Sequence, residues 1–145
     1  MKIVEYNARQ EKQVSQFIVT CKSEKWKQAI REELEIINKI DTCKAFVAFD
    51  HHGKVNGFIS IWKTGNVYFI SWMNSCNDDE AILKDLLMKA VQLARDNGIK
   101  VINTTVEQTY METLQVLLQL GFRVTGYTRH RYELNENELQ LSYLL

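Results

Sequence analysis

The chain has 145 residues, of which 46% are hydrophobic and 25% charged, the composition of an ordinary globular domain. Its 18 basic and 18 acidic residues give a formal net charge of 0, which removes the general electrostatic attraction to DNA, RNA or anionic lipid. We therefore expect one domain over residues 1–145, with no nucleic acid and no membrane as its partner.

Three cysteines are present, Cys21, Cys43 and Cys76. Their odd number and the lack of a C-x-x-C pair argue against both a disulfide framework and a zinc site. The sequence shows no export signal and no apolar run of the roughly 18 residues that span a bilayer. We therefore predict a cytoplasmic protein with reduced thiols and no metal.

The first forty residues predict one strand and two helices. Met1–Tyr6 predicts a short strand, and Asn7 with Gln10 resembles a capping box that opens a helix. A second amphipathic helix ends near Ile40. The apolar faces of the two helices are formed by Val14, Phe17, Ile18 and Cys21, and by Trp26, Ile30, Leu34 and Ile37.

The middle of the chain predicts three antiparallel strands. Ala45–Phe49 and Val55–Trp62 flank a glycine-bearing turn at residues 50–54, which indicates a β-hairpin. Val67–Met73 follows a second turn and is almost continuously apolar, which is typical of a central strand buried on both faces.

A βαβ unit is predicted next. After a polar loop at residues 74–79, a long amphipathic helix ends at Asn97-Gly98, and Ile99–Val106 forms a strand. Because such crossovers are right-handed in about 98% of cases, the two flanking strands should be parallel and the sheet mixed.

The last part predicts a helix and a closing hairpin. Gly121 stops a helix, and Phe122–Leu134 with Glu138–Leu145 would pair around residues 135–137. The apolar residues of that helix are Met111, Leu114, Leu117 and Leu118. The complete order is βααβββαβαββ, an α/β (α+β) fold with a mixed central sheet.

This order resembles the GCN5-related N-acetyltransferase (GNAT) superfamily, whose members move an acyl group from acyl-CoA to an amine. The resemblance covers the whole chain. It is strongest from Ile70 to Phe122, where the family pattern fits without a gap and ends on Gly121-Phe122. It implies a GNAT-like domain, acetyl-CoA as co-substrate and a small-molecule or peptide amine as acceptor.

The family's Q/R-x-x-G-x-G/A loop falls on Asp78-Asp-Glu-Ala-Ile-Leu83. The basic or amide residue is thus Asp78, and the glycines, which let backbone amides approach a pyrophosphate, become Ala81 and Leu83. At roughly 8 Å and an effective dielectric of ~60, each nearby carboxylate would repel one phosphate charge by about 0.7 kcal/mol. We therefore expect weakened acetyl-CoA binding.

The same resemblance places Ser71 and Met73 where the main chain of the family's central strand pairs with the pantetheine arm of CoA. This contact does not depend on the side chains. The expected cofactor-binding residues are therefore Ser71, Met73, Asp78, Ala81 and Leu83.

The family's helix asparagine and its tyrosine, the general acid toward the leaving thiolate, fall on Tyr110 and Leu117. Leucine cannot donate a proton, so another group or water would have to act. The candidate catalytic residues are Glu107, Tyr110 and Tyr127, although a tyrosine at such a position is more often the edge of a core and a glutamate more often a solvated strand end. The Cys76 thiol is a further candidate, or a small apolar filler.

The histidines have structural explanations. His51 and His52 share a predicted turn with Asp50, and adjacent turn residues point in different directions, so a turn is favoured over a metal site. His130 lies between two arginines on a predicted strand. It would meet an acidic substrate or phosphate, or belong to an exposed strand face.

Two classes of function follow. The first is a divergent acyl-CoA-dependent N-acyltransferase that relies on proximity and amide donors. The second is a catalytically impaired module that keeps the groove for a protein, peptide or small effector. The helix at residues 23–40 has surface for a lid, a homodimer contact or plain core packing, and the acceptor is not defined by the sequence.

Overall fold

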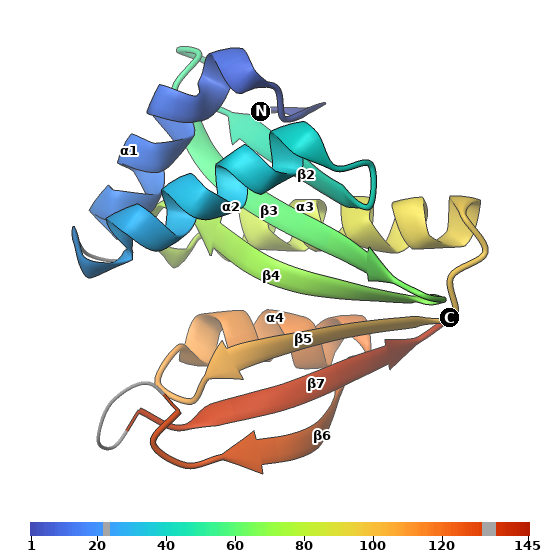
Figure 1. The fold of residues 1–145 in the computed structure, drawn as a ribbon. Coiled ribbons are helices and arrows are strands. Elements are labelled where there is room, and N and C mark those ends of the chain that lie inside the picture. Colours follow the sequence, from blue (N-terminus) through green and yellow to red (C-terminus); the bar gives the residue numbers. More distant parts are fainter. Residues whose placement is uncertain (22–23, 132–135) are drawn as a thin grey trace.

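The chain is described by a computed structural model that covers residues 1–21, 24–131 and 136–145. It forms an α/β domain with helices on both faces of a mixed sheet (Figure 1). The strands are β1 (Lys2–Glu5), β2 (Cys43–Phe49), β3 (Val55–Thr64), β4 (Val67–Ser75), β5 (Val101–Glu107), β6 (Arg123–Thr128) and β7 (Glu138–Leu144). The α-helices are α1 (Glu11–Cys21), α2 (Lys27–Lys39), α3 (Glu80–Asp96) and α4 (Met111–Leu120).

The strand order is β1-β2-β3-β4-β5-β7-β6. All neighbouring strands are antiparallel except β4 and β5, which are parallel as the βαβ unit predicts. The predicted order of elements and the mixed sheet are therefore confirmed.

The predicted capping box is also present. The Asn7 side chain accepts a hydrogen bond from the Arg9 amide at 3.0 Å, and the Gln10 side chain accepts one from the Asn7 amide at 3.1 Å. These bonds open a short 3-10 turn, Ala8–Gln10, that leads directly into α1. Two amides that the helix start would otherwise leave unpaired are satisfied locally.

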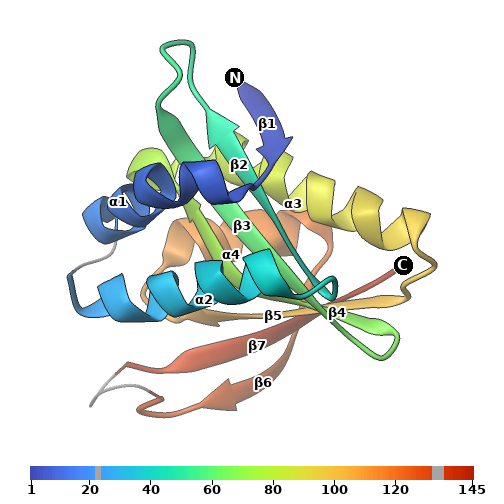
Figure 2. The same ribbon diagram turned by 45° about the horizontal axis from the view of Figure 1, so that its top comes forward.

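Two hydrophobic cores lie on the two faces of the sheet. Helices α1 and α2 cover one face, and α3 and α4 cover the other (Figures 1 and 2). The core under α3 and α4 is the larger, and its fully buried members include Ile59, Leu86, Leu87, Ile102 and Phe122. The core under α1 and α2 includes Val14, Ile18, Ile30, Leu34 and Phe58.

Strand β4 differs from the expectation of burial on both faces. Tyr68, Ile70 and Ser75 are buried, but residues 71–74 are only half-buried. The apolar run is therefore a central strand for only the first part of its length, because its neighbour β5 pairs with only that part.

The apolar residues of helix α4 differ in their burial. Met111 and Leu118 are exposed, whereas Val116 and Leu117 are buried. The helix ends at Gly121, whose φ of +111° lies in the left-handed region that favours glycine. The predicted stop is therefore confirmed, and the buried side of the helix is formed by Val116 and Leu117.

The predicted strand boundaries near the last hairpin need two corrections. Strand β6 ends at Thr128, so His130 lies in a turn with a φ of +49° and not on a strand. Leu134 and Asn135, at the expected turn, and Ser23, at the expected start of the second helix, lie outside the described residues. That helix begins at Lys27, after a 3-10 turn at Glu24–Trp26.

None of the helices that the structure describes has the length and apolar character needed to cross a lipid bilayer.

Candidate active site

The main feature of the sheet is the separation of its two parallel strands. Strand β5 pairs with β4 only from Val67–Val101 to Ile70–Thr104. At that last position the Thr104 hydroxyl donates to the Ile70 carbonyl at 3.1 Å. Beyond it the strands diverge, as Figure 1 shows toward the arrowheads of β4 and β5. The second half of β4 therefore has a main-chain edge that β5 does not cover.

The divergence begins at a β-bulge. Ser60 of β3 pairs with Trp72, and the next residue, Ile61, pairs with Ile70, so Ser71 is an extra residue in β4. A bulge bends its strand and increases the local twist, and such bulges are frequent beside active sites. Ser71, predicted to contact the donor, thus lies where β4 turns away from β5, and Met73 lies two residues farther along the open edge.

A buried carboxylate holds the bulge in place. Glu33, on α2, is only 8% exposed. Its Oε2 accepts a hydrogen bond from the Ser71 hydroxyl at 2.6 Å, and its Oε1 accepts one from the Trp62 indole N–H at 3.0 Å. The Ser60 hydroxyl lies 2.7 Å from that of Ser71 and 3.3 Å from Glu33 Oε2. This group, the Glu33 cluster, links α2 to β3 and β4.

Glu33 is absent from the site residues predicted from the sequence, although its position in the helix carries a signal. The residue lies three positions after Ile30 and four before Ile37, so helical periodicity places it on the buried face of α2. A carboxylate at such a position needs hydrogen-bond donors, and the cluster provides them.

The thiol of Cys43 is next to this cluster. Burial, and secondarily the negative charge of Glu33, raises the pKa of Cys43 from 9.0 to about 12. Cys43 pairs with Trp62 across β2 and β3. This thiol therefore stays protonated and is not a nucleophile at neutral pH.

The start of α3 is where the family places its phosphate-binding loop. A 3-10 turn, Cys76–Asp78, precedes the helix, and Asp79 is the N-cap residue. The Asp79 carboxylate accepts hydrogen bonds from the Ala81 amide at 2.9 Å and the Ile82 amide at 3.2 Å. The amides that would meet a phosphate thus already bind a carboxylate of the chain itself.

The other predicted loop residues have varied positions. The Leu83 side chain is buried in the core at 2% exposure, and its amide donates to the Asp79 carbonyl at 3.1 Å. Ala81 is exposed on the first turn of α3. Asp78 ends the 3-10 turn, and its side chain lies outside the described part of the structure. The contacts of these residues with a cofactor remain a prediction.

The structure does not bring the three candidate catalytic residues together. Val106 and Leu139 are cross-strand partners that both contact the core under α3 and α4. Tyr127 pairs with Leu139 and so faces the same side, whereas Glu107, which follows Val106, faces the side of α1 and α2. Tyr110 is the N-cap of α4 and is partly exposed.

Leu117, at the position of the family tyrosine, is fully buried in the core. Its side chain has no acidic proton to donate and does not reach solvent. Cys76 is half-buried and packs against the core under α1 and α2, which fits the small apolar filler.

Two ion pairs of the described residues lie where β5 ends and β7 begins. Arg131 Nε lies 3.6 Å from Glu138 Oε1, and Lys25 Nζ lies 3.5 Å from Glu136 Oε1. The second pair connects the segment between α1 and α2 to the residues before β7.

Glu138, which is buried, is the cross-strand partner of Glu107. Carboxylates from α2, β5 and β7 therefore lie on the face covered by α1 and α2.

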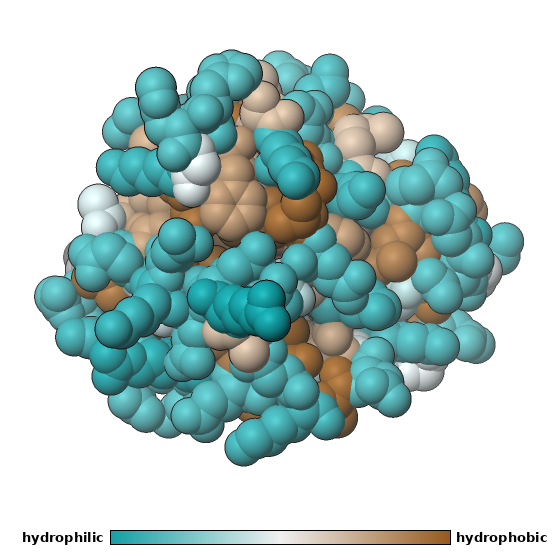
Figure 3. Space-filling model, turned by 90° about the horizontal axis from the view of Figure 1, so that it is seen from above, coloured by the Kyte–Doolittle hydropathy of each residue, from teal (hydrophilic) through white to brown (hydrophobic). Residues whose placement is uncertain are grey.

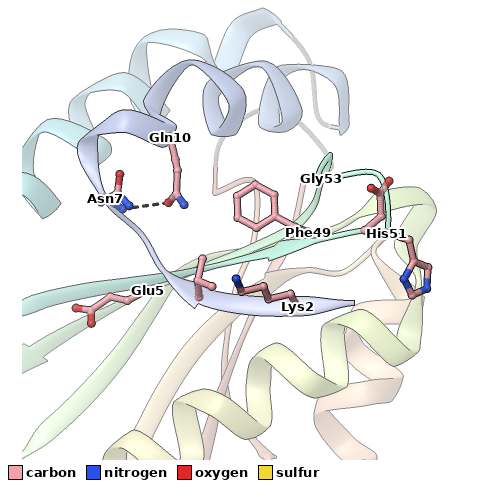
Figure 4. Close-up of a pocket in the computed structure, with 9 residues that line it drawn as sticks. Lys2, Glu5, Asn7, Gln10, Phe49, His51 and Gly53 are labelled. Carbon is pink, nitrogen blue, oxygen red and sulfur yellow. Dashed lines mark hydrogen bonds between the residues drawn. The ribbon is translucent and has the colours of Figure 1, made fainter.

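A separate hollow of about 540 Å³ lies at the β1 edge. Figure 3 views that end of the molecule and shows hydrophobic side chains among hydrophilic ones, and in Figure 4 the Phe49 ring points into the hollow below α1. Its polar groups are largely committed: Asn7 and Gln10 bond to each other, and Asp50 accepts from the amides of His52 and Lys54 at 2.8 and 2.9 Å.

These bonds also explain the histidine-bearing turn. The amide of Lys54, with that of His52, lowers the pKa of Asp50. The predicted turn at residues 50–54 is confirmed by the Gly53 amide, which donates to the Asp50 carbonyl at 3.1 Å. Within the described residues no group of three or more His, Cys, Asp or Glu side chains is arranged to hold a metal ion.

The residues present fit one half of a CoA thioester better than the other. The edge of β4 beyond Ile70, which β5 does not cover, would offer main-chain groups to the amides of a pantetheine arm. The start of α3, with Asp79 on its amides, does not offer the same groups to a diphosphate.

Comparison with solved structures supports the resemblance. The aminoglycoside 6'-acetyltransferase type Ii superposes with a TM-score of 0.84 at 16% identity, covering 99% of this chain and 97% of that one. An aminoglycoside 6'-N-acetyltransferase complexed with coenzyme A gives 0.83 at 14% identity, with 99% and 97% covered. The ribosomal-protein-alanine N-acetyltransferase from Brucella melitensis gives 0.81 at 16% identity over 100% of both chains.

No protein-family model and no curated protein matches the sequence. The likeness therefore lies in the arrangement of the backbone. The chain therefore has the fold of these acetyltransferases, the GNAT fold.

Proposed function

We propose that this chain is an N-acyltransferase that moves an acyl group, in the first instance acetyl, from a CoA thioester to an amine. The carrying observation is the divergence of β4 from β5 after Ile70 and Thr104, with the bulge at Ser71. It leaves a main-chain edge beside which an extended thioester would lie, on a fold shared with acetyltransferases.

The proposed donor contacts use the main chain of Ser71 and Met73. Because backbone amides and carbonyls make these contacts, they do not require the family's side chains. The Glu33 cluster would hold the bulge in the conformation that exposes them, which is the preorganisation that positioning catalysis needs.

The proposed acceptor is an amine that approaches from the face of α1 and α2. Glu33, Glu107 and Glu138 all lie on that face, and negative charge attracts an ammonium group. The reaction forms a C–N bond at the acyl carbon and breaks its C–S bond, while one amine proton is lost and the CoA thiol is released.

Glu107, Tyr110 and Tyr127 are proposed for the proton transfers. Glu107 is on the acceptor face and would take the proton of the amine. Tyr110 begins the same helix that carries Leu117 and would protonate the thiolate, with Tyr127 as the second choice. Tyr110→Phe should lower turnover by about 100-fold if this assignment holds.

The test is an acetylation assay with millimolar acetyl-CoA and a panel of amines. The panel should contain aminoglycosides and peptides with amino-terminal alanine, the acceptors named for two of the structural neighbours, and also polyamines and free amino acids. Acetylated product from one amine, detected by mass spectrometry, is expected. No product from any amine and no binding of acetyl-CoA would contradict the proposal and favour a non-catalytic module.

A further inference from the structure

We propose that the chain recognises its donor through the acyl-pantetheine arm and does not bind the diphosphate of coenzyme A, because Asp79 occupies the amides that would hold it. This inference rests on the proposed function and specifies how its donor is recognised. The acyl-pantetheine half of acyl-CoA would provide most of the binding affinity, and the nucleotide half would provide little.

Most of the backbone amides at the start of α3 already donate hydrogen bonds within the chain. Those of Ala81 and Ile82 donate to the Asp79 carboxylate at 2.9 and 3.2 Å. That of Leu83 donates to the Asp79 carbonyl at 3.1 Å, and that of Asp79 itself to the Cys76 carbonyl at 3.1 Å. Four amides between residues 79 and 83 thus have acceptors within the loop and the first turn.

A diphosphate would have to displace the Asp79 carboxylate to reach them. Both groups are anions and compete for the same N–H donors and the same positive end of the helix dipole. The carboxylate is tethered to the backbone beside these donors, so its effective concentration is high, whereas the diphosphate must be ordered on binding. Glu80, next to Asp79, adds a further negative charge.

The pantetheine contacts are independent of this competition. They lie on the open edge of β4 from Ser71 onward, whose conformation is set by the bulge and the Glu33 cluster. The start of α3 can therefore lose its phosphate site while the thioester keeps its position between β4 and β5.

The first experiment compares the dissociation constants of acetyl-CoA and S-acetylpantetheine by calorimetry. We expect them to differ by less than about tenfold, because no strong phosphate contact separates the two probes. If acetyl-CoA binds more tightly by about tenfold or more, the inference is wrong and the proposed function stands. If neither probe binds, the proposed function itself is contradicted, and the inference with it.

The second experiment tests whether Asp79 is the cause. Asp79→Gly removes the carboxylate and frees both amides, and glycine is an adequate N-cap residue. Acetyl-CoA should then bind about 100-fold more tightly, the equivalent of two charge-assisted hydrogen bonds, and S-acetylpantetheine should be unaffected.

Glu80→Gln is the matched control, since it removes one negative charge from the same turn and leaves the Asp79 cap intact. It should tighten acetyl-CoA binding by only about threefold, and Asp79→Asn, which keeps a neutral capping oxygen, should resemble it. Thermal unfolding verifies that each variant is folded. If Asp79→Gly tightens acetyl-CoA no more than Glu80→Gln does, occupation of the amides is not what excludes the diphosphate.

Discussion

Glu33, a residue of α2, stabilises the conformation of the bulge in strand β4 through hydrogen bonds. Its carboxylate accepts hydrogen bonds from Ser71 on β4 and Trp62 on β3, and it is almost wholly removed from solvent. A buried carboxylate is tolerated only when donors satisfy it, and here the donors come from the residues that form the bulge. The cluster thus connects helix packing to the shape of the candidate site.

Replacement of Glu33 should lower the free energy of unfolding. Glu33→Ala leaves polar groups of Trp62, Ser60 and Ser71 to pair only with one another and should cost about 2 kcal/mol, while Glu33→Gln, which keeps one acceptor oxygen, should cost about 1 kcal/mol. Urea unfolding measures both. Glu35→Ala, an exposed position on the same helix, is the control and should change stability by less than about 0.5 kcal/mol. Equal effects at positions 33 and 35 would contradict the role of the cluster.

Cys43 provides a test that depends on pH. Its pKa in the folded protein, about 12, lies above the 9.0 of a free thiol, so the folded state keeps a proton that the unfolded state releases. The resulting contribution to stability is complete below pH 9 and is lost as the pH rises from 9 toward 12. In mildly alkaline solution, iodoacetamide should alkylate the exposed Cys21 and leave Cys43 unmodified, as peptide mass spectrometry would show. Modification of both thiols at equal rates would contradict the burial of Cys43.

At the scale of elements, the sequence predicted the features that depend on neighbouring residues. It did not predict the features that depend on contacts between distant segments. The capping box at Asn7, the stop at Gly121 and the turn at Asp50 each depend on a few neighbouring residues, so the sequence predicts them. The half-burial of residues 71–74 depends on the divergence of β5 from β4 beyond Ile70 and Thr104, which no pattern within β4 records.

The hydrogen bonding at the start of α3 also could not be predicted from the local sequence pattern. The acidic residues at positions 78–80 predicted charge repulsion toward a phosphate. The hydrogen bonds from two amides to the Asp79 side chain, by contrast, require the geometry of the turn that precedes the helix.

The close packing of α3 against Gly57 of β3 gives a prediction about the position of that helix. A methyl group at Gly57 would lie 2.8 Å from Ile82 Cγ2 and 2.9 Å from Leu86 Cδ1, closer than carbon atoms pack. Gly57→Ala should therefore force α3 away from the sheet and cost about 1–3 kcal/mol. Thermal unfolding would measure this, with Ala81→Gly as a control for a small change on the exposed side of α3. An unchanged melting temperature for Gly57→Ala would show that the helix is not held this closely.

At the scale of the whole molecule, the order of elements predicted the sheet and its one parallel pair, because crossover handedness and short connections leave few topologies. The chain matches solved acetyltransferases over nearly its full length at 14–16% identity. The backbone arrangement is thus shared with these proteins at low sequence identity. A shared fold does not by itself define a function, because the side chains of the site decide which reaction is performed.

Amide hydrogen exchange tests the central claim, that the uncovered edge of β4 binds the acyl donor, most directly. Exchange is followed by mass spectrometry with and without saturating acetyl-CoA. Peptides covering residues 71–75 should be protected on binding, while those covering the turn at residues 50–54 should not change. Protection at the turn instead, or binding of acetyl-CoA with no protection at residues 71–75, would contradict the account.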